Sequence, residues 1–343
     1  MALFPTKYLD AVIMAGEQYK LEQFEGRLSN YDVFLAFQQN TAALIPAAEL
    51  EAAKTSHSRV TKIPVLNKID FTIGNERACT PSATPITSAF VQPSYTTYTF
   101  SFDITPSYNA DNYITQQREF THKLMQGLKK FGETIDADAL TFLDSNASQV
   151  NASPLFGGIV GDVVTVAGAE KDEFYKSIPS IFRRNDLSGD RVIDIANPEA
   201  QILYDFLQRQ GAGNAVNTSY QISNFAPYRS NSVDAGVGNT ELHYLVANGH
   251  IGTLQWIPVD YRVGRGEGDS VWTSIVDPVF GLTWAMRYVY ECADLSAVSQ
   301  GYNQLTSAFV EKFEFSIDIA FMTSYSSDTS SAIFKYEIAE PLS

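Results

Sequence analysis

Residues 112–146 read NYITQQREFTHKLMQGLKKFGETIDADALTFLDSN, and this stretch decides the fold. Its large apolar residues recur at spacings of three and four, which is the period of one face of an α-helix. The residues of this stripe are Phe120, Leu124, Leu128, Phe131, Ile135, Ala139 and Phe142. At about 1.5 Å of rise per residue the stretch predicts a rod of roughly 50 Å, which must lie across another layer of structure. Gly127 and Gly132 within the rod indicate a bend or a close crossing.

An extended, aromatic-rich segment, residues 59–106, precedes the predicted helix. Residues 59–71 and 96–104 both alternate between apolar and polar side chains, which is typical of β-strands. The small residues and prolines of 80–85 lie between the two runs and predict a turn. The two runs would form one long hairpin, which is only marginally stable in water on its own. We therefore expect this segment to pack on neighbouring copies of the chain.

The rest of the chain reads as helical pieces over residues 9–50 and as a mixed α/β region after residue 161. Asn197–Pro198–Glu199 opens a helix, because proline favours the first helical turn, and Gly211 ends it. The further predicted elements are strands at 163–166, 191–195, 283–292, 310–322 and 331–338, a helix at 171–184 and a Gly-rich, charged loop at 263–269.

Composition narrows the classes of function. The chain has 343 residues, of which 45% are hydrophobic and 13% aromatic, so it can bury a sizeable core. Its net charge is -15, and a protein that binds free duplex DNA would normally carry a basic surface instead. The two cysteines, Cys79 and Cys292, are far apart and predict no disulfide framework. The absence of a long apolar run or a signal sequence leads us to expect no membrane association and a cytoplasmic site of synthesis.

The residue types that usually carry chemistry are scattered along the chain. The four histidines are His57, His122, His243 and His250. No two of them have HxxxH or HxH spacing and no cysteine lies near one, so a zinc site is not expected. We interpret all four as surface or loop histidines.

Three other short stretches have a structural interpretation that we prefer. Gly264–Gly268 lacks the strand and helix that a phosphate-binding loop needs, so it is interpreted as a loop. Asp186–Asp190, with Asp194 beyond, has its glycine too early for a calcium loop and is interpreted as a turn. Glu170 and Asp172 are interpreted as solvated. We therefore assign no catalytic, cofactor-binding or metal-ligating residue and predict that the protein is not an enzyme.

The order of these elements resembles the major capsid proteins of tailed bacteriophages, which have the Hong Kong 97-type fold. Three short strings add to the likeness: Ile193–Pro198, Asn224–Val233 and Gly249–Gly252. The resemblance implies an α+β fold with an N-terminal helical arm at 1–58, an extended hairpin loop at 59–106, a spine helix and peripheral domain at 107–161, an axial domain at 162–282, and closing strands of the peripheral domain at 283–343.

The resemblance also implies a function. The protein would assemble with copies of itself into hexamers and pentamers of an icosahedral shell, located in the virion and assembled in the host cytoplasm. The shell would enclose DNA without sequence-specific binding, and it would need separate scaffolding and portal proteins, with a decoration protein as a further candidate. In one member of the family a Lys on the hairpin links covalently to a neighbour. Lys62 and Lys68 lie on the matching segment, but no motif identifies a partner Asn, so we interpret both as surface lysines.

Two alternatives stay open at this point. A double jelly-roll capsid protein would need about sixteen strands in two similar halves, and the long helix and the lack of internal similarity disfavour it. An α/β enzyme or ligand-binding protein is suggested by the alternation of strands and helices in residues 162–210, but no recognisable site accompanies it.

Overall fold

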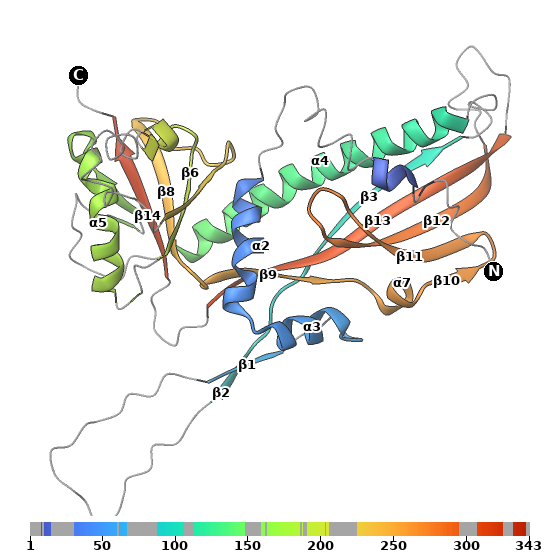
Figure 1. Cartoon of the computed structure of the whole chain (residues 1–343), viewed down its shortest axis with the longest axis horizontal. Helices are drawn as coiled ribbons and strands as arrows, with labels where there is room; N and C mark the ends of the chain where they lie inside the picture. Colours follow the sequence, from blue (N-terminus) through green and yellow to red (C-terminus); the bar gives the residue numbers. More distant parts are fainter. Residues whose placement is uncertain are drawn as a thin grey trace, which may run out of the picture.

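The computed structural model describes residues 8, 10–14, 31–59, 62–66, 88–105, 113–147, 159–161, 163–185, 187, 191–202, 204–205, 225–294, 307–324 and 332–340. Within these ranges the chain is an α+β protein with two six-stranded sheets and a separate two-stranded hairpin. The long helix α4 runs along the first sheet and reaches the second with its C-terminal end (Figure 1). This arrangement confirms the predicted α+β class.

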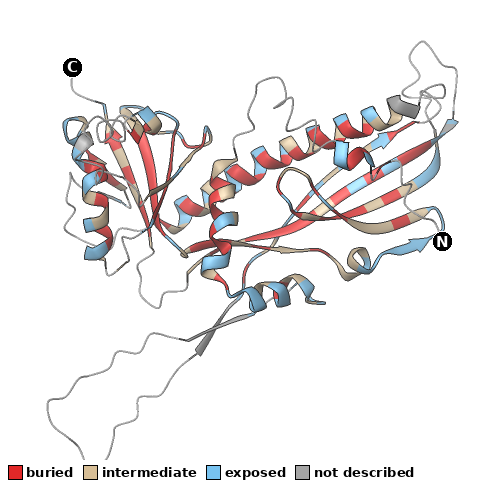
Figure 2. Cartoon of the chain, in the orientation of Figure 1, coloured by how far each residue is buried: buried red, intermediate tan, exposed pale blue. Residues whose placement is uncertain are grey.

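Helix α4 spans Tyr113–Asn146, close to the predicted bounds. The apolar stripe from Phe120 to Ala139 is buried, as predicted (Figure 2). Its residues from Phe120 to Ile135 pack in the core of the first sheet, and Ala139 packs in the core beneath the second. Phe142 is only half-buried, and Leu143 takes the buried position because it continues the spacing of four from Ala139. The ring of Phe142 lies at the border of the stripe, 5.7 Å from the ring of Phe321.

The two glycines of α4 mark close crossings, as predicted. A Cβ atom added at Gly127 would lie 2.5 Å from the ring of Phe100, and one added at Gly132 would lie 2.9 Å from the ring of Phe280. Ordinary carbon contacts are about 3.5–4.0 Å, so no larger residue fits at either position without displacement of an aromatic ring.

The first sheet has the order β10-β11-β12-β13-β3, and β9 also pairs with β13. Its strands are β10 (Arg265–Glu267), β11 (Ser270–Val276), β12 (Thr283–Asp294), β13 (Ser307–Thr323), β3 (Thr96–Ile104) and β9 (Ile251–Trp256). One end of β13 pairs with β12 and the other end with β9, while β3 lies along its other edge. Because β10 pairs with β11, the predicted loop at 263–269 is wrong: its centre is a strand.

The long hairpin predicted over residues 59–106 is shorter than expected. Strand β1 (Ile63–Leu66) pairs with β2 (Ser88–Val91), whereas 96–104 forms β3 and pairs with β13. The reason is that Phe100 and Phe102 find aromatic partners in β13, where they lie opposite Phe315 and Phe313. The predicted turn at 80–85 lies outside the described residues.

The second sheet has the order β4-β5-β14-β8-β6-β7. Its strands are β4 (Ile159–Val160), β5 (Val163–Val166), β14 (Ile333–Ala339), β8 (Asn239–Ala247), β6 (Val192–Ala196) and β7 (Phe225–Arg229). Helix α5 (Lys171–Arg184), preceded by the short helix η2 (Gly168–Glu170), covers one face and agrees with the predicted helix. Helix α2 and the end of α4 cover the other face.

The expected boundary at residue 282 does not coincide with the sheets. Strands β9, β10 and β11 precede it and yet join the first sheet, whereas β14 follows it and joins the second. Strand partners are set by register and burial in three dimensions, and neither is visible in the order of the chain.

The N-terminal region supplies helices, as predicted. Helix α2 (Asp32–Leu44) lies at the junction of the two sheets, where Phe37 packs beside Phe142 and Phe321. Helix α3 (Ala47–Thr55) follows Pro46 and buries only Ala53. It therefore presents most of its surface to solvent (Figure 2). The β1–β2 hairpin begins near it (Figure 1).

Candidate functional site

The β1–β2 hairpin is the first candidate surface. Its two strands pair with each other and with no other described strand, and they extend away from the body (Figure 1). Lys62, directly before β1, is exposed, and Lys68 lies outside the described residues. An isolated two-stranded sheet is marginal in water, so the hairpin is suited to pair or pack with another molecule.

The base of the hairpin is fixed to the body. The guanidinium of Arg262, on the short helix α7 (Val259–Val263), donates hydrogen bonds to the carbonyl oxygens of Lys54 (2.8 Å) and Ser56 (2.6 Å). The indole of Trp256 donates to the same Ser56 carbonyl at 3.0 Å. Arg59 forms an ion pair with Asp318 of β13 at 3.5 Å. The segment just before the hairpin is therefore held in place by the first sheet.

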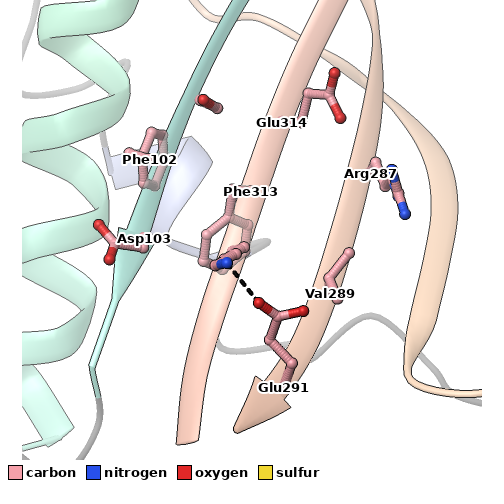
Figure 3. A pocket seen from close by; sticks show the side chains of 9 residues that line it. Phe102, Asp103, Arg287, Val289, Glu291, Phe313 and Glu314 are labelled. Atoms are coloured by element: carbon pink, nitrogen blue, oxygen red, sulfur yellow. Dashed lines mark hydrogen bonds and ion pairs between the residues drawn. The ribbon is translucent and has the colours of Figure 1, made fainter. Parts of the chain in front are cut away.

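The first sheet has an open face opposite α4, and it is a second candidate surface. A depression of about 570 Å³ there is lined by Ser101, Phe102, Asp103, Arg287, Val289, Glu291, Lys312, Phe313 and Glu314. Glu291 of β12 forms an ion pair with the ammonium of Lys312 on the neighbouring strand β13, at 2.5 Å. The dashed line at Glu291 in Figure 3 marks this pair. Acidic and basic side chains alternate on this face, which suits contact with a protein surface of matching charges.

One row of this open face is built around Trp272. The guanidinium groups of Arg265 and Arg287 lie 5.9 Å and 5.7 Å from the Trp272 ring, on the neighbouring strands β10 and β12. Arg265 also pairs with Glu267 at 2.7 Å. Aromatic and arginine side chains of this kind contribute strongly where protein surfaces meet.

The structure places the four histidines in three different environments. His57 and His122 are exposed, as predicted. His250 is half-buried, and its Nδ1 lies 2.5 Å from the hydroxyl of Ser324. His243 has no exposed surface, so its interpretation as a surface or loop residue is wrong. It lies in the middle of β8, where the sheet covers one side of the ring and α5 the other.

His243 is the centre of a buried ionic network. Its Nδ1 lies 2.8 Å from a carboxylate oxygen of Asp194, on β6, and its Nε2 lies 3.2 Å from a carboxylate oxygen of Glu241. The other oxygen of Asp194 accepts a hydrogen bond from Arg229, on β7, at 2.8 Å. Glu241 pairs in turn with Lys171, the first residue of α5. The five groups form an unbroken chain in which cations and anions alternate.

The electrostatics of the network favour its ionised forms. Burial alone would raise the pKa of Asp194, but the charges of Arg229 and His243 lower it to about 2. Burial likewise opposes ionisation of Glu241, but hydrogen bonds from His243 and Lys171 hold its pKa below the ordinary value. Burial would lower the pKa of His243, but Asp194 and Glu241 outweigh it and raise that pKa.

A second set of polar contacts joins α4 to the rest of the fold. The buried carboxylate of Asp136 accepts hydrogen bonds from the backbone N–H of Phe34 (3.1 Å) and from the hydroxyl of Ser230 (2.7 Å). Asp144, in the last turn of α4, accepts hydrogen bonds from Tyr244 at 2.8 Å and from Lys335 at 2.6 Å. These contacts hold the helix to α2 and to the second sheet.

The other residues singled out in the sequence do not form a reactive site among the described residues. Gly264 and Gly268 adopt positive φ angles at the two ends of β10. Cys292 is exposed, and Cys79 lies outside the described residues. Most of Asp186–Asp190 also lies outside them. Within the described ranges no three His, Cys, Asp or Glu side chains are grouped to hold a metal ion, and no helix is long and apolar enough to cross a membrane.

Comparison with known proteins finds similar solved structures. No family model and no curated protein matches the chain. A structure from Mycobacterium phage Che8 has a TM-score of 0.47 at 10% identity, over 87% of this chain and 89% of that one.

Two further similar structures come from cyanophages. The capsid structure of cyanophage P-SCSP1u has a TM-score of 0.46 at 10% identity, over 84% and 86% of the two chains. The capsid asymmetric unit of cyanophage A-1(L) has a TM-score of 0.48 at 14% identity, over 86% and 92%. Over most of its length, the chain is thus similar to chains in phage capsid structures.

Proposed function

We propose that this protein is a structural shell subunit, the major capsid protein of a tailed bacteriophage with the Hong Kong 97-type fold. The observation that carries the proposal is the β1–β2 hairpin. It extends away from the body of the subunit, which anchors its base (Figure 1). Among the described residues, β1 and β2 pair with each other and with no further strand. A hairpin of this kind is completed by contact with a neighbouring copy.

Charge is compatible with this role for the hairpin. Between Ile63 and Val91 two basic side chains balance two acidic ones, whereas the whole chain has a net charge of -15. A neutral hairpin adds no electrostatic repulsion where it meets the acidic surface of another copy. Because the same contact is repeated around a ring, each single contact can be weak.

In this proposal the elements take the roles that the resemblance implies. Residues 1–58 form the N-terminal arm, the hairpin is the extended loop and α4 is the spine helix. The second sheet with α5 forms the axial domain, which packs around the symmetry axes of hexamers and pentamers. The first sheet forms the peripheral domain, including β9, β10 and β11.

The proposed shell is assembled in the host cytoplasm and becomes the capsid of the virion. It encloses DNA without sequence-specific binding, since the net charge of -15 on every subunit opposes close contact with phosphate. Separate scaffolding and portal proteins are the expected partners, with a decoration protein as a further candidate.

A shortened hairpin tests the proposal. Residues 67–87 are replaced by Asn-Gly, which suits a two-residue turn between Leu66 and Ser88, the last opposed pair of the hairpin. We expect the variant to fold, because β1, β2 and the anchored base remain, but to sediment as small species where the unaltered chain forms large particles. Circular dichroism checks the fold, and Lys130→Ala, an exposed change on α4, serves as the control. A shortened variant that still closes shells of normal size would refute the role of the hairpin.

A further inference from the structure

We propose that the buried ionic network is a pH-dependent clasp that holds α5 on the second sheet. The clasp is closed while both ring nitrogens of His243 are protonated, and it loosens when one of these protons is lost. This device goes beyond the assembly role, because it concerns how firmly one helix is held within a subunit. Its five members are Lys171, Glu241, His243, Asp194 and Arg229.

The geometry around the imidazole carries the proposal. A neutral imidazole has one N–H, and its other nitrogen is an acceptor. Both ring nitrogens of His243 face carboxylate oxygens, those of Asp194 at 2.8 Å and of Glu241 at 3.2 Å. Loss of either proton would leave a nitrogen lone pair opposite a buried carboxylate, with no donor between them. The arrangement is therefore complete only when the ring is doubly protonated.

The net charge of the network depends on the protonation of His243. Three cations and two anions make up the network when the ring is charged, and the cluster becomes neutral when it is not. Tyr175 on α5 faces the cluster, and burial holds its pKa well above the ordinary value. Tyr204 lies against Arg229, and Tyr336 of β14 lies opposite His243, with its own pKa raised by burial.

Helix α5 is the element that the clasp would release. The rings of Phe174 and Tyr175 lie 5.0 Å and 5.7 Å from the imidazole of His243. Lys171 is a cation in the first turn of α5, where the helix dipole disfavours positive charge, so its position depends on Glu241. The Lys171 side chain is 28% exposed, and it is the end of the network nearest to solvent.

The sign of the pH effect follows from linkage. The folded state binds the His243 proton more tightly than an opened state does, so the stabilisation is complete below the ordinary pKa of about 6.5. It is lost as the pH rises through the higher pKa of the folded state. Across that window the opening equilibrium of α5 increases by about tenfold per pH unit. His250 cannot produce this effect, because burial lowers its pKa and gives the opposite sign.

Hydrogen–deuterium exchange of the full chain between pH 6 and pH 9 tests the clasp, after correction for the intrinsic pH dependence of amide exchange. We expect peptides from 171–184 to lose protection as the pH rises, while peptides from the buried centre of α4 keep theirs. His243→Gln should abolish this pH dependence, and the matched change His122→Gln, at an exposed position, should preserve it.

Lys171→Gln is a second variant that leaves His243 in place. It should lower the protection of α5 at every pH and keep the pH dependence, because His243 still titrates between Asp194 and Glu241. The clasp is refuted if wild-type α5 shows no pH dependence, if α4 changes equally, or if His243→Gln keeps the wild-type slope.

Discussion

Replacing Phe131 tests whether α4 is a spine packed on the first sheet. The Phe131 side chain is 5% exposed, and its ring lies 4.7 Å from Trp284, 5.4 Å from Phe280, 5.6 Å from Tyr98 and 6.4 Å from Phe34. These partners come from α2, β3, the turn before β12 and β12 itself. A single ring therefore joins the helix to elements that are far apart in the sequence.

Phe131→Ala removes the ring and leaves a cavity that rigid aromatic neighbours cannot fill. We expect the free energy of unfolding to fall by about 3–5 kcal/mol, the usual range for a buried Phe→Ala change. The assay is urea unfolding of dissociated subunits followed by tryptophan fluorescence, since Trp284 contacts the mutated ring directly. The matched control is Glu133→Ala on the exposed side of α4, which removes only its ion pair with Lys130.

The control should change stability by less than about 1 kcal/mol, because exposed ion pairs contribute little. Phe131→Leu should fall between the two, since it keeps part of the buried volume. If Phe131→Ala and Glu133→Ala destabilise the subunit equally, the helix does not pack as described and the reasoning fails.

Three further results are expected. Asp277→Ala should lower the free energy of unfolding by at least about 3 kcal/mol. The Asp277 carboxylate accepts hydrogen bonds from three backbone N–H groups and from the Trp284 indole, and the change would leave all four donors unpaired. Urea unfolding measures the loss, and a value below about 1 kcal/mol would contradict this prediction. In a thermal scan, Gly249→Ala should melt at a lower temperature than Gly281→Ala. Both positions have a positive φ, but only at Gly249 would the new Cβ lie close to the Ala43 carbonyl oxygen, at 3.2 Å. Equal melting temperatures of the two variants would contradict this contact. Isolated subunits should not retard random-sequence duplex DNA in a gel at physiological salt, given the net charge of -15, and tight retardation would instead indicate a basic binding face.

The helices were the most predictable part of the fold. The 3.6-residue period located α4 to within one residue, and the Lys171–Arg184 helix agreed with α5 despite Pro179 inside it. Periodicity works here because each helix buries one continuous stripe against a sheet. The glycines of α4 were also informative, since a costly residue in a helix usually has a packing reason.

Strand partners could not be predicted in the same way. Alternation identified 96–104 as a strand, but its partner β13 lies about two hundred residues later, and the sequence alone suggested the nearer run at 59–71. The expected boundary at residue 282 does not follow the two sheets for the same reason. Alternation reports which face is buried and says nothing about the neighbouring strand.

The buried network was missed because its members are dispersed between residues 171 and 243. A signal was nevertheless present. Asp194 interrupts the apolar run Val192–Ala196. Glu241 and His243 lie two residues apart in the buried part of β8, where the other residues are apolar or aromatic. A charged side chain inside a fully buried strand requires a partner of opposite charge. The sequence therefore supports the hypothesis that Asp194 and Glu241 pair with His243.

Electron cryomicroscopy of the purified full-length protein tests the central claim most directly. We expect closed shells or rings of five and six subunits, in which the β1–β2 hairpin of each copy lies on the surface of a neighbour. Particles of a single 37.9 kDa chain, under conditions that span low and high salt, would contradict the assignment of this protein as a self-assembling shell subunit.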